Sequence, residues 1–105
     1  MICPETIYRT AYELNRLAAV KIPSDVKEEI SRMYQRETCT LPKYVFNQVL
    51  KNYEKAERED RPMCSDTGLP RFYVKLGNEA TVEGGMVAFE KMIRRATAAA
   101  TGAVS

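Results

Sequence analysis

The sequence predicts an α+β fold that is predominantly helical, with about four helices and one strand after the loop that contains Cys64. Two observations lead to this prediction. Apolar residues recur at helical spacing in four segments, and residues 71–76 alternate between apolar and polar side chains. The chain has 105 residues, which is enough for one small domain with a modest core.

The first two helices follow from apolar spacing and from proline positions. The first is expected from about Glu5 to Val20, with Pro4 at its first position, where proline is tolerated. Its buried face is expected to comprise Ile7, Ala11, Leu14 and Ala18. Pro23 should end this segment, and Ser24 is expected to cap a second helix that runs to about Arg36. The buried face of that helix should comprise Val26, Ile30 and Met33.

Two further helices are predicted in the same way. The third begins near Pro42 and ends in a charged run, residues 51–60, which is typical of a solvated helix face. Its apolar face comprises Val45, Phe46, Val49, Leu50 and Tyr53. Pro62 should stop it. The last helix is expected from about Val82 to Ala100, after a turn at residues 77–78. Its buried face should comprise Met86, Phe89, Ile93 and Ala96.

The predicted strand is residues 71–76, with Phe72, Val74 and Leu76 on one face. A single strand leaves its main-chain hydrogen-bonding groups unpaired, so it needs a second strand beside it. That second strand is expected to be a short unrecognised one or to lie outside this chain. We therefore expect the chain to be a fragment of a larger domain or one subunit of it.

Composition excludes several classes of function. Sixteen basic and fourteen acidic residues give a net charge of +2, and their signs alternate along the helices, so we expect no binding to nucleic acid. No apolar run approaches the roughly 20 residues that cross a bilayer. The absence of histidine means that neither a zinc site nor a Ser-His triad can be completed within this chain. Three cysteines without a CxxC pair indicate a reducing, cytoplasmic location.

The loop RPMCSDTG, residues 61–68, places a cysteine among polar residues and not on an apolar face. Pro62 stiffens the approach to Cys64, and Gly68 lets the main chain fold tightly. A thiol on such a loop suits a metal ligand or a reactive sulfur. Asp66 suits a general base, a substrate-orienting acceptor or a turn former. From the residues alone an ordinary turn is the simpler interpretation, because Asp-Thr-Gly favours turns and one cysteine does not define a metal site.

The same segment resembles the N-terminal part of the iron–sulfur hydro-lyases, a group that includes the class I fumarate hydratases and the alpha subunit of L(+)-tartrate dehydratase. The resemblance rests on RPMCSDTG at 61–68, FYVKLG at 72–77 and RAT at 95–97. In that family a P-x-C-Q-D-T-G loop supplies the first of three cysteine ligands to a 4Fe–4S cluster. The iron that lacks a protein thiolate acts as a Lewis acid on the substrate hydroxyl.

The resemblance implies that Cys64 is the metal ligand, as the first cysteine of the 4Fe–4S cluster. It also implies that Asp66 faces a hydroxy-acid substrate, with the hydroxyls of Ser65 and Thr67 as further substrate-binding groups. Ser65 stands where the family has glutamine, and its shorter side chain reaches less far, so the identity of the substrate does not carry over by analogy. The other two cysteine ligands and the catalytic base are expected outside this chain.

The implied activity is reversible hydration or dehydration of a small dicarboxylate, of the fumarate/malate or tartrate class. Residues 1–60 would be a helical region, and residues 61–105 the ligand loop, strand and helix of an alpha-type catalytic domain. The chain alone should be inactive, with no catalytic residue of its own. Expected partners are the rest of that domain and a beta-type subunit or domain, assembled as an oligomer.

Two other interpretations stay open at this stage. In the first, the chain is a non-catalytic helical protein-interaction module, the loop is a turn and Cys64 is inert. In the second, Cys64 is a single redox-sensing thiol, which requires it to be acidic and exposed. Cys3 and Cys39 match neither missing cluster ligand and are expected to act as small apolar residues.

Overall fold

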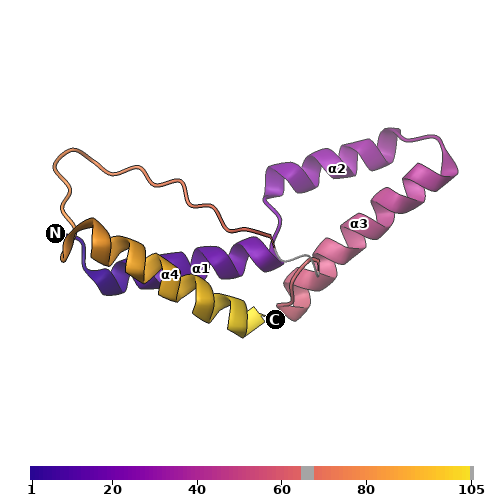
Figure 1. The fold of residues 1–105 in the computed structure, drawn as a ribbon. Helices are drawn as coiled ribbons and strands as arrows, with labels where there is room; N and C mark the ends of the chain where they lie inside the picture. Colours follow the sequence, from indigo (N-terminus) through magenta and orange to yellow (C-terminus); the bar gives the residue numbers. More distant parts are fainter. Residues whose placement is uncertain (65–67, 105) are drawn as a thin grey trace. The chain divides into compact units, whose positions relative to one another are not determined.

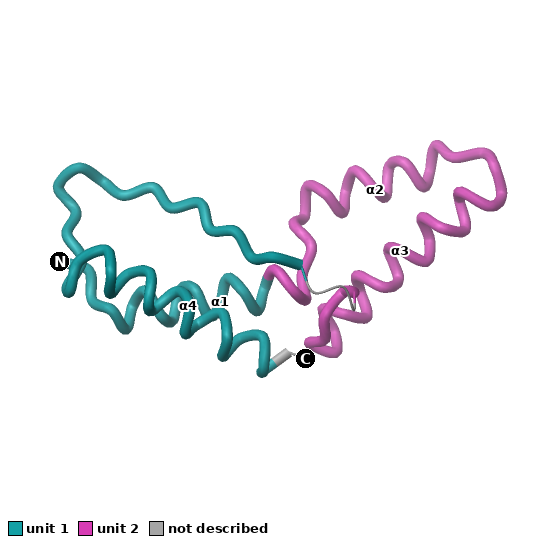
Figure 2. The backbone as a smooth tube through the Cα atoms, in the orientation of Figure 1, with its two compact units in different colours: residues 1–17, 66–105 teal, residues 18–65 magenta. Residues whose placement is uncertain are grey.

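The computed structural model describes residues 1–64 and 68–104, and these residues contain four α-helices (Figure 1). The helices are α1 (Pro4–Val20), α2 (Ser24–Arg36), α3 (Thr40–Glu59) and α4 (Gly85–Val104). The chain divides into two compact units (Figure 2): unit 1 comprises residues 1–17 and 66–105, and unit 2 comprises residues 18–65. The prediction of a predominantly helical chain is confirmed.

Helix ends agree with the sequence pattern to within a few residues, and one predicted cap is wrong. Helix α1 begins at Pro4, as expected. Ser24 lies inside α2, and the residue at the cap position is Pro23, which makes no side-chain capping hydrogen bond. Helix α4 begins at Gly85 and not near Val82. A cap depends on the main-chain angles at the first turn, which residue type alone does not fix.

In unit 1, small side chains let α1 and α4 approach each other. The buried residues there are Ile7 and Ala11 of α1 and Ala96 and Ala100 of α4. The Asn15 Nδ2 atom donates to the Ala11 carbonyl at 2.8 Å and lies 3.2 Å from the Thr97 hydroxyl oxygen. One polar side chain therefore links the two helices in this unit.

The N-terminal residues of unit 1 pair with the segment that leads into α4. A parallel bridge joins Ile2 to Val82. The Ile2 N–H donates to the Thr81 carbonyl at 2.7 Å, and the Glu83 N–H donates to the Ile2 carbonyl at 3.0 Å. This short pairing fixes where the chain enters the glycine turn before α4.

The turn before α4 requires glycine at position 84. Gly84 has a φ of 82°, and a Cβ placed there would lie 2.8 Å from the Ala88 Cβ. Gly84→Ala should destabilise the fold by about 2 kcal/mol or more, because left-handed angles alone cost an L-residue roughly 1–2 kcal/mol. Denaturant unfolding measures the effect, with Gly77→Ala as the control, since a Cβ at Gly77 meets no atom within 4 Å. Equal midpoints for the two variants would contradict this account of the turn.

The predicted strand at residues 71–76 is wrong. These residues follow an extended path (Figure 1) but belong to no strand, and their main chain makes no hydrogen bond with another described residue. Phe72 is half-buried, whereas Val74 and Leu76 are exposed and Tyr73 is 91% exposed. The alternation of side chains is real, but a strand also needs a neighbouring strand, and the described residues offer none. The α+β class is therefore not supported within this part of the chain.

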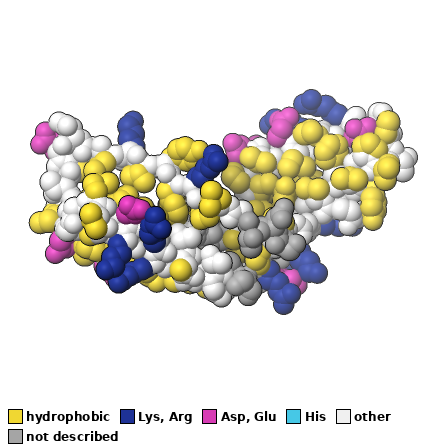
Figure 3. Space-filling view, in the orientation of Figure 1, with side chains coloured by type: hydrophobic (Ala, Val, Ile, Leu, Met, Phe, Trp, Pro, Cys, Tyr) yellow, Lys and Arg dark blue, Asp and Glu magenta, His cyan; other side chains and the backbone are white. Residues whose placement is uncertain are grey.

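In unit 2, α2 and α3 pack against each other as a helical hairpin. The buried residues of this unit are Val20, at the end of α1, and Ala56 of α3. Figure 3 shows apolar side chains gathered over α2 and α3. The expected buried face of α2 is not covered, since Val26 and Met33 are exposed and Ile30 is half-buried.

The same correction applies to other predicted core positions. Leu14 is 54% exposed and Met86 is 58% exposed, and Ala18 is also exposed. Phe89 and Ile93 are half-buried, and only Ala96 of that predicted face is fully covered. Periodicity identifies the apolar face of a helix but not the element that covers it. Among the described helices, none has a stretch both long and apolar enough to cross a membrane.

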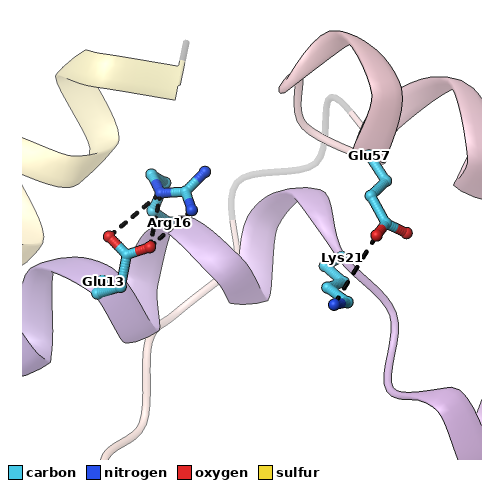
Figure 4. A network of polar contacts seen from close by, with 4 residues as sticks. All are labelled: Glu13, Arg16, Lys21 and Glu57. Carbon is cyan, nitrogen blue, oxygen red and sulfur yellow. Dashed lines mark hydrogen bonds and ion pairs between the residues drawn. The ribbon is translucent and has the colours of Figure 1, made fainter.

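Charged side chains form short-range pairs on the helix surfaces (Figure 4). In unit 1, the Arg16 guanidinium lies 2.6 Å from the Glu13 carboxylate, and this hydrogen bond lowers the pKa of Glu13. In unit 2, Lys21 Nζ lies 3.8 Å from Glu57 of α3. Exposed pairs of this kind contribute little to stability, but the second one joins the end of α1 to α3.

Candidate functional site

Helix α3 ends in a reversal that starts at Asp60. Asp60 adopts left-handed main-chain angles with a φ of 55°, which aspartate tolerates better than most residues. Its N–H donates to the Ala56 carbonyl, and the Arg61 N–H donates to the same carbonyl at 3.0 Å. Pro62 has no N–H with which to continue the helix. The chain therefore leaves α3 here, and residues 60–64 are called the return segment below.

The return segment is attached to both helices beside it through Met63. The Met63 N–H donates to the carbonyl of Ala19, near the end of α1, at 2.9 Å. The Met63 carbonyl accepts a hydrogen bond from Asn52 Nδ2 on α3 at 2.7 Å. Asn52 precedes the end of α3 by about two turns, so the return segment runs back along this helix. These two bonds fix the main chain immediately before Cys64.

A groove of about 550 Å³ lies along α3 beside the return segment. Its walls come mainly from one face of α3, and its lining residues are Ile22, Tyr44, Val45, Gln48, Val49, Asn52, Tyr53, Met63 and Cys64. Its described lining residues include no lysine or arginine, so they offer no cation to neutralise a carboxylate. The groove by itself is therefore suited to an apolar group and not to a dicarboxylate.

Cys64 lines this groove, and its side chain is exposed. A metal ligand must be reachable, and it binds best when its main chain is already ordered. The bonds at Met63 supply that order, and the exposure supplies the access. Cys64 is therefore accessible on an ordered main chain, and its role as a metal ligand stays a prediction.

The other cysteines do not complete a metal site with Cys64 in unit 2. Cys39 is exposed and precedes α3, and the stretch of α3 from Thr40 to Asn52 is about 18 Å long. Cys3 is exposed too. Over residues 1–64 and 68–104, no group of three or more His, Cys, Asp or Glu side chains could hold a metal ion. The described residues thus offer at most one metal ligand, Cys64, and no complete metal site.

Ser65, Asp66 and Thr67, the expected substrate-binding residues, lie outside the described residues. Of the predicted set, the structure therefore locates Cys64 alone.

Sequence reasoning missed the two residues that hold the chain before Cys64. Asn52 sits in a charged, exposed part of α3, where its residue type gives no sign of a role. Ala19 acts through its main-chain carbonyl, which every residue has. Only the reversal at Asp60 brings Met63 back to Asn52, so no local pattern could have identified the contact.

Comparisons with known proteins give one family. The family model described as fumarate hydratase (fumerase) matches residues 8–105. A protein of Methanocaldococcus jannaschii with a provisional name as an L(+)-tartrate dehydratase subunit alpha is 35% identical over 65 residues, which cover 62% of this chain and 23% of that protein. The L(+)-tartrate dehydratase subunit alpha of Escherichia coli K12 is 27% identical over 85 residues, which cover 81% of this chain and 27% of that protein.

A Shigella boydii protein of the same name gives the same values as the Escherichia coli one. The chain thus spans about a quarter of the length of these relatives. No solved structure was found to match it.

Proposed function

Because this chain belongs to the fumarate hydratase family, we propose that it is the N-terminal portion of the alpha-type catalytic domain of an iron–sulfur hydro-lyase. The observation that carries the proposal is the fixed main chain at Met63, which presents the exposed Cys64 beside α3 within the region matched by the family. Residues 1–60 are then the helical region. Residues 61–105 hold the ligand loop, the extended segment and α4.

The proposed reaction is the reversible addition of water across the carbon–carbon double bond of a small dicarboxylate, in the fumarate/malate or tartrate class. When bound, a 4Fe–4S cluster would supply Lewis-acid polarisation of the substrate hydroxyl. In this chain the Cys64 thiolate is the proposed cluster ligand, since soft thiolates are the usual ligands of such clusters. One thiolate does not hold a cluster, so this chain alone is expected to be inactive.

Substrate contact is assigned to Asp66, with the hydroxyls of Ser65 and Thr67 beside it. An aspartate there would accept a hydrogen bond from the substrate hydroxyl and so orient it. The cations that neutralise the two carboxylates are proposed to come from elsewhere, because the described residues that line the groove next to Cys64 include no lysine or arginine. This division agrees with a domain whose remaining part supplies the catalytic base and the carboxylate-binding residues.

The proposed partners are the rest of the alpha-type domain and a beta-type subunit or domain. Two of the relatives described above are named as alpha subunits of a dehydratase, and a subunit with that name implies a second one. We place the assembly in the cytoplasm, as an oligomer. The exposed apolar residues of α2 and α3, including Val26, Met33 and Val45, provide surface for such contacts.

A non-catalytic helical interaction module is the second candidate function. The observation that favours it is the same exposed apolar surface, which needs no cluster to explain it. The two candidates differ in what they require of Cys64: the hydro-lyase needs its thiolate, whereas the module does not.

The test is to purify the assembly that contains this chain without oxygen, supply iron and sulfide, and assay it with malate, fumarate and L(+)-tartrate. The hydro-lyase proposal expects a visible sulfide-to-iron absorption band and turnover of at least one of these dicarboxylates. An assembly that takes up iron and sulfide at no more than background level, and turns over none of the three, would leave the interaction module as the function.

A further inference from the structure

We propose that Asn52 is a positioning residue for Cys64, because its side-chain amide fixes the peptide group from which the Cys64 sulfur is presented to the cluster. The inference deepens the proposed function and rests on it. Its starting point is the 2.7 Å hydrogen bond from Asn52 Nδ2 to the Met63 carbonyl.

The peptide bond that joins Met63 to Cys64 is planar. The Met63 carbonyl lies in one plane with the N–H and the Cα of Cys64. A hydrogen bond that holds this oxygen therefore also limits the position of the Cys64 Cα, from which the sulfur extends by one rotatable bond. Asn52 thus acts on Cys64 through a rigid unit and needs no contact with the sulfur.

The peptide group before Met63 is held as well. The Met63 N–H belongs to the peptide group that joins Pro62 to Met63, and it donates to the Ala19 carbonyl at 2.9 Å. With the planes on both sides of Met63 fixed, the two main-chain angles of Met63 have little freedom left. Of these two anchors, only Asn52 acts through a side chain, so only Asn52 can be removed by substitution.

The hydrogen bond between Asn52 and Met63 has a fixed direction, with Asn52 as the donor. A main-chain carbonyl only accepts hydrogen bonds, so the Asn52 amide must face it with the NH₂ group. An aspartate at this position would have the same shape but would place a carboxylate oxygen against the carbonyl oxygen. Asn52→Asp therefore keeps the packing of the side chain while it replaces an attractive contact with a repulsive one.

The test compares Asn52→Asp with Gln48→Glu in the complete cluster-loaded assembly. Gln48 lies one turn earlier on α3 and lines the same groove, so its change to glutamate adds the same charge nearby and leaves the bond from Asn52 to Met63 in place. The measurement is the rate at which the visible cluster absorption disappears in the presence of an iron chelator. We expect a loss about 10- to 100-fold faster in Asn52→Asp, the range typical for residues that orient metal ligands, and no change in Gln48→Glu.

Two further measurements separate positioning from other causes. Asn52→Ala removes the donor without adding charge, and it should also lose the cluster faster than the wild type. Unfolding of the cluster-free assemblies should be nearly unchanged, because the bond is exposed. Cluster loss at the wild-type rate in both Asn52 variants would overturn the inference. So would an equal acceleration in Gln48→Glu, or a cluster loss that merely follows a loss of folding stability.

The outcome for Cys64→Ser distinguishes a failure of the positioning role of Asn52 from a failure of the proposed function. If that variant loses the cluster while the Asn52 variants keep it as long as the wild type, only the positioning role is wrong. If Cys64→Ser keeps the cluster, the proposed function itself fails, and the positioning role fails with it.

Discussion

Cys64→Ser should remove the visible absorption band of the iron–sulfur cluster and abolish dehydratase activity in the complete assembly. Serine has nearly the same shape as cysteine, but its hydroxyl does not ionise near neutral pH and is a poor ligand for iron in such clusters. The effect should exceed the roughly 10- to 100-fold losses that follow changes to residues around metal ligands. It is measured by absorption and by turnover after anaerobic reconstitution with iron and sulfide.

The controls are Cys3→Ser and Cys39→Ser, which should leave both the band and the activity intact. Both thiols are exposed, as Cys64 is, so iron and sulfide can reach all three. A difference between the variants then reflects where each cysteine lies in the structure. Cys39 in particular lies before α3, about 18 Å along that helix from the level of Asn52. An intact cluster in the Cys64 variant would refute the assignment of Cys64 as ligand.

Asp66→Asn should keep the cluster and lower turnover by about 100-fold or more. Asparagine preserves the size of the side chain but replaces an acceptor-only carboxylate with an amide. The substrate hydroxyl is then no longer held in the productive orientation, and a misplaced reactant typically lowers the rate by about 100-fold. Steady-state kinetics measure the loss, and the visible spectrum shows whether the cluster is retained.

The matched control is Asp25→Asn, the same change in the first turn of α2, where Asp25 accepts a hydrogen bond from the Val26 N–H. It should leave turnover unchanged. Wild-type kinetics in the Asp66 variant would reduce Asp66 to a turn-forming residue. Loss of the cluster together with activity would instead show that Asp66 supports the cluster and does not act on the substrate alone.

The site was partly predictable from the chain. The polar surroundings of Cys64 and the resemblance of residues 61–68 to a family loop single this residue out. The family is confirmed over residues 8–105, whereas the role of Cys64 as a ligand stays a prediction. Asn52 was not, because its contact with Met63 spans the end of a helix and a reversal of the chain. The roles of Ser65, Asp66 and Thr67 stay predictions, since these residues lie outside the described part of the chain.

The sequence by itself determined where the helices lie, because helical periodicity and proline positions are local properties of the chain. It also places alternating apolar and polar side chains at residues 71–76. Only the tertiary structure decided that Leu14, Val26 and Met86 are exposed, since burial depends on whether another element covers a face. Strand formation at 71–76 likewise depends on a neighbour, and the described residues provide none. The fixed presentation of Cys64 arises in the same way, from α1, α3 and the return segment together, through bonds that no single segment encodes.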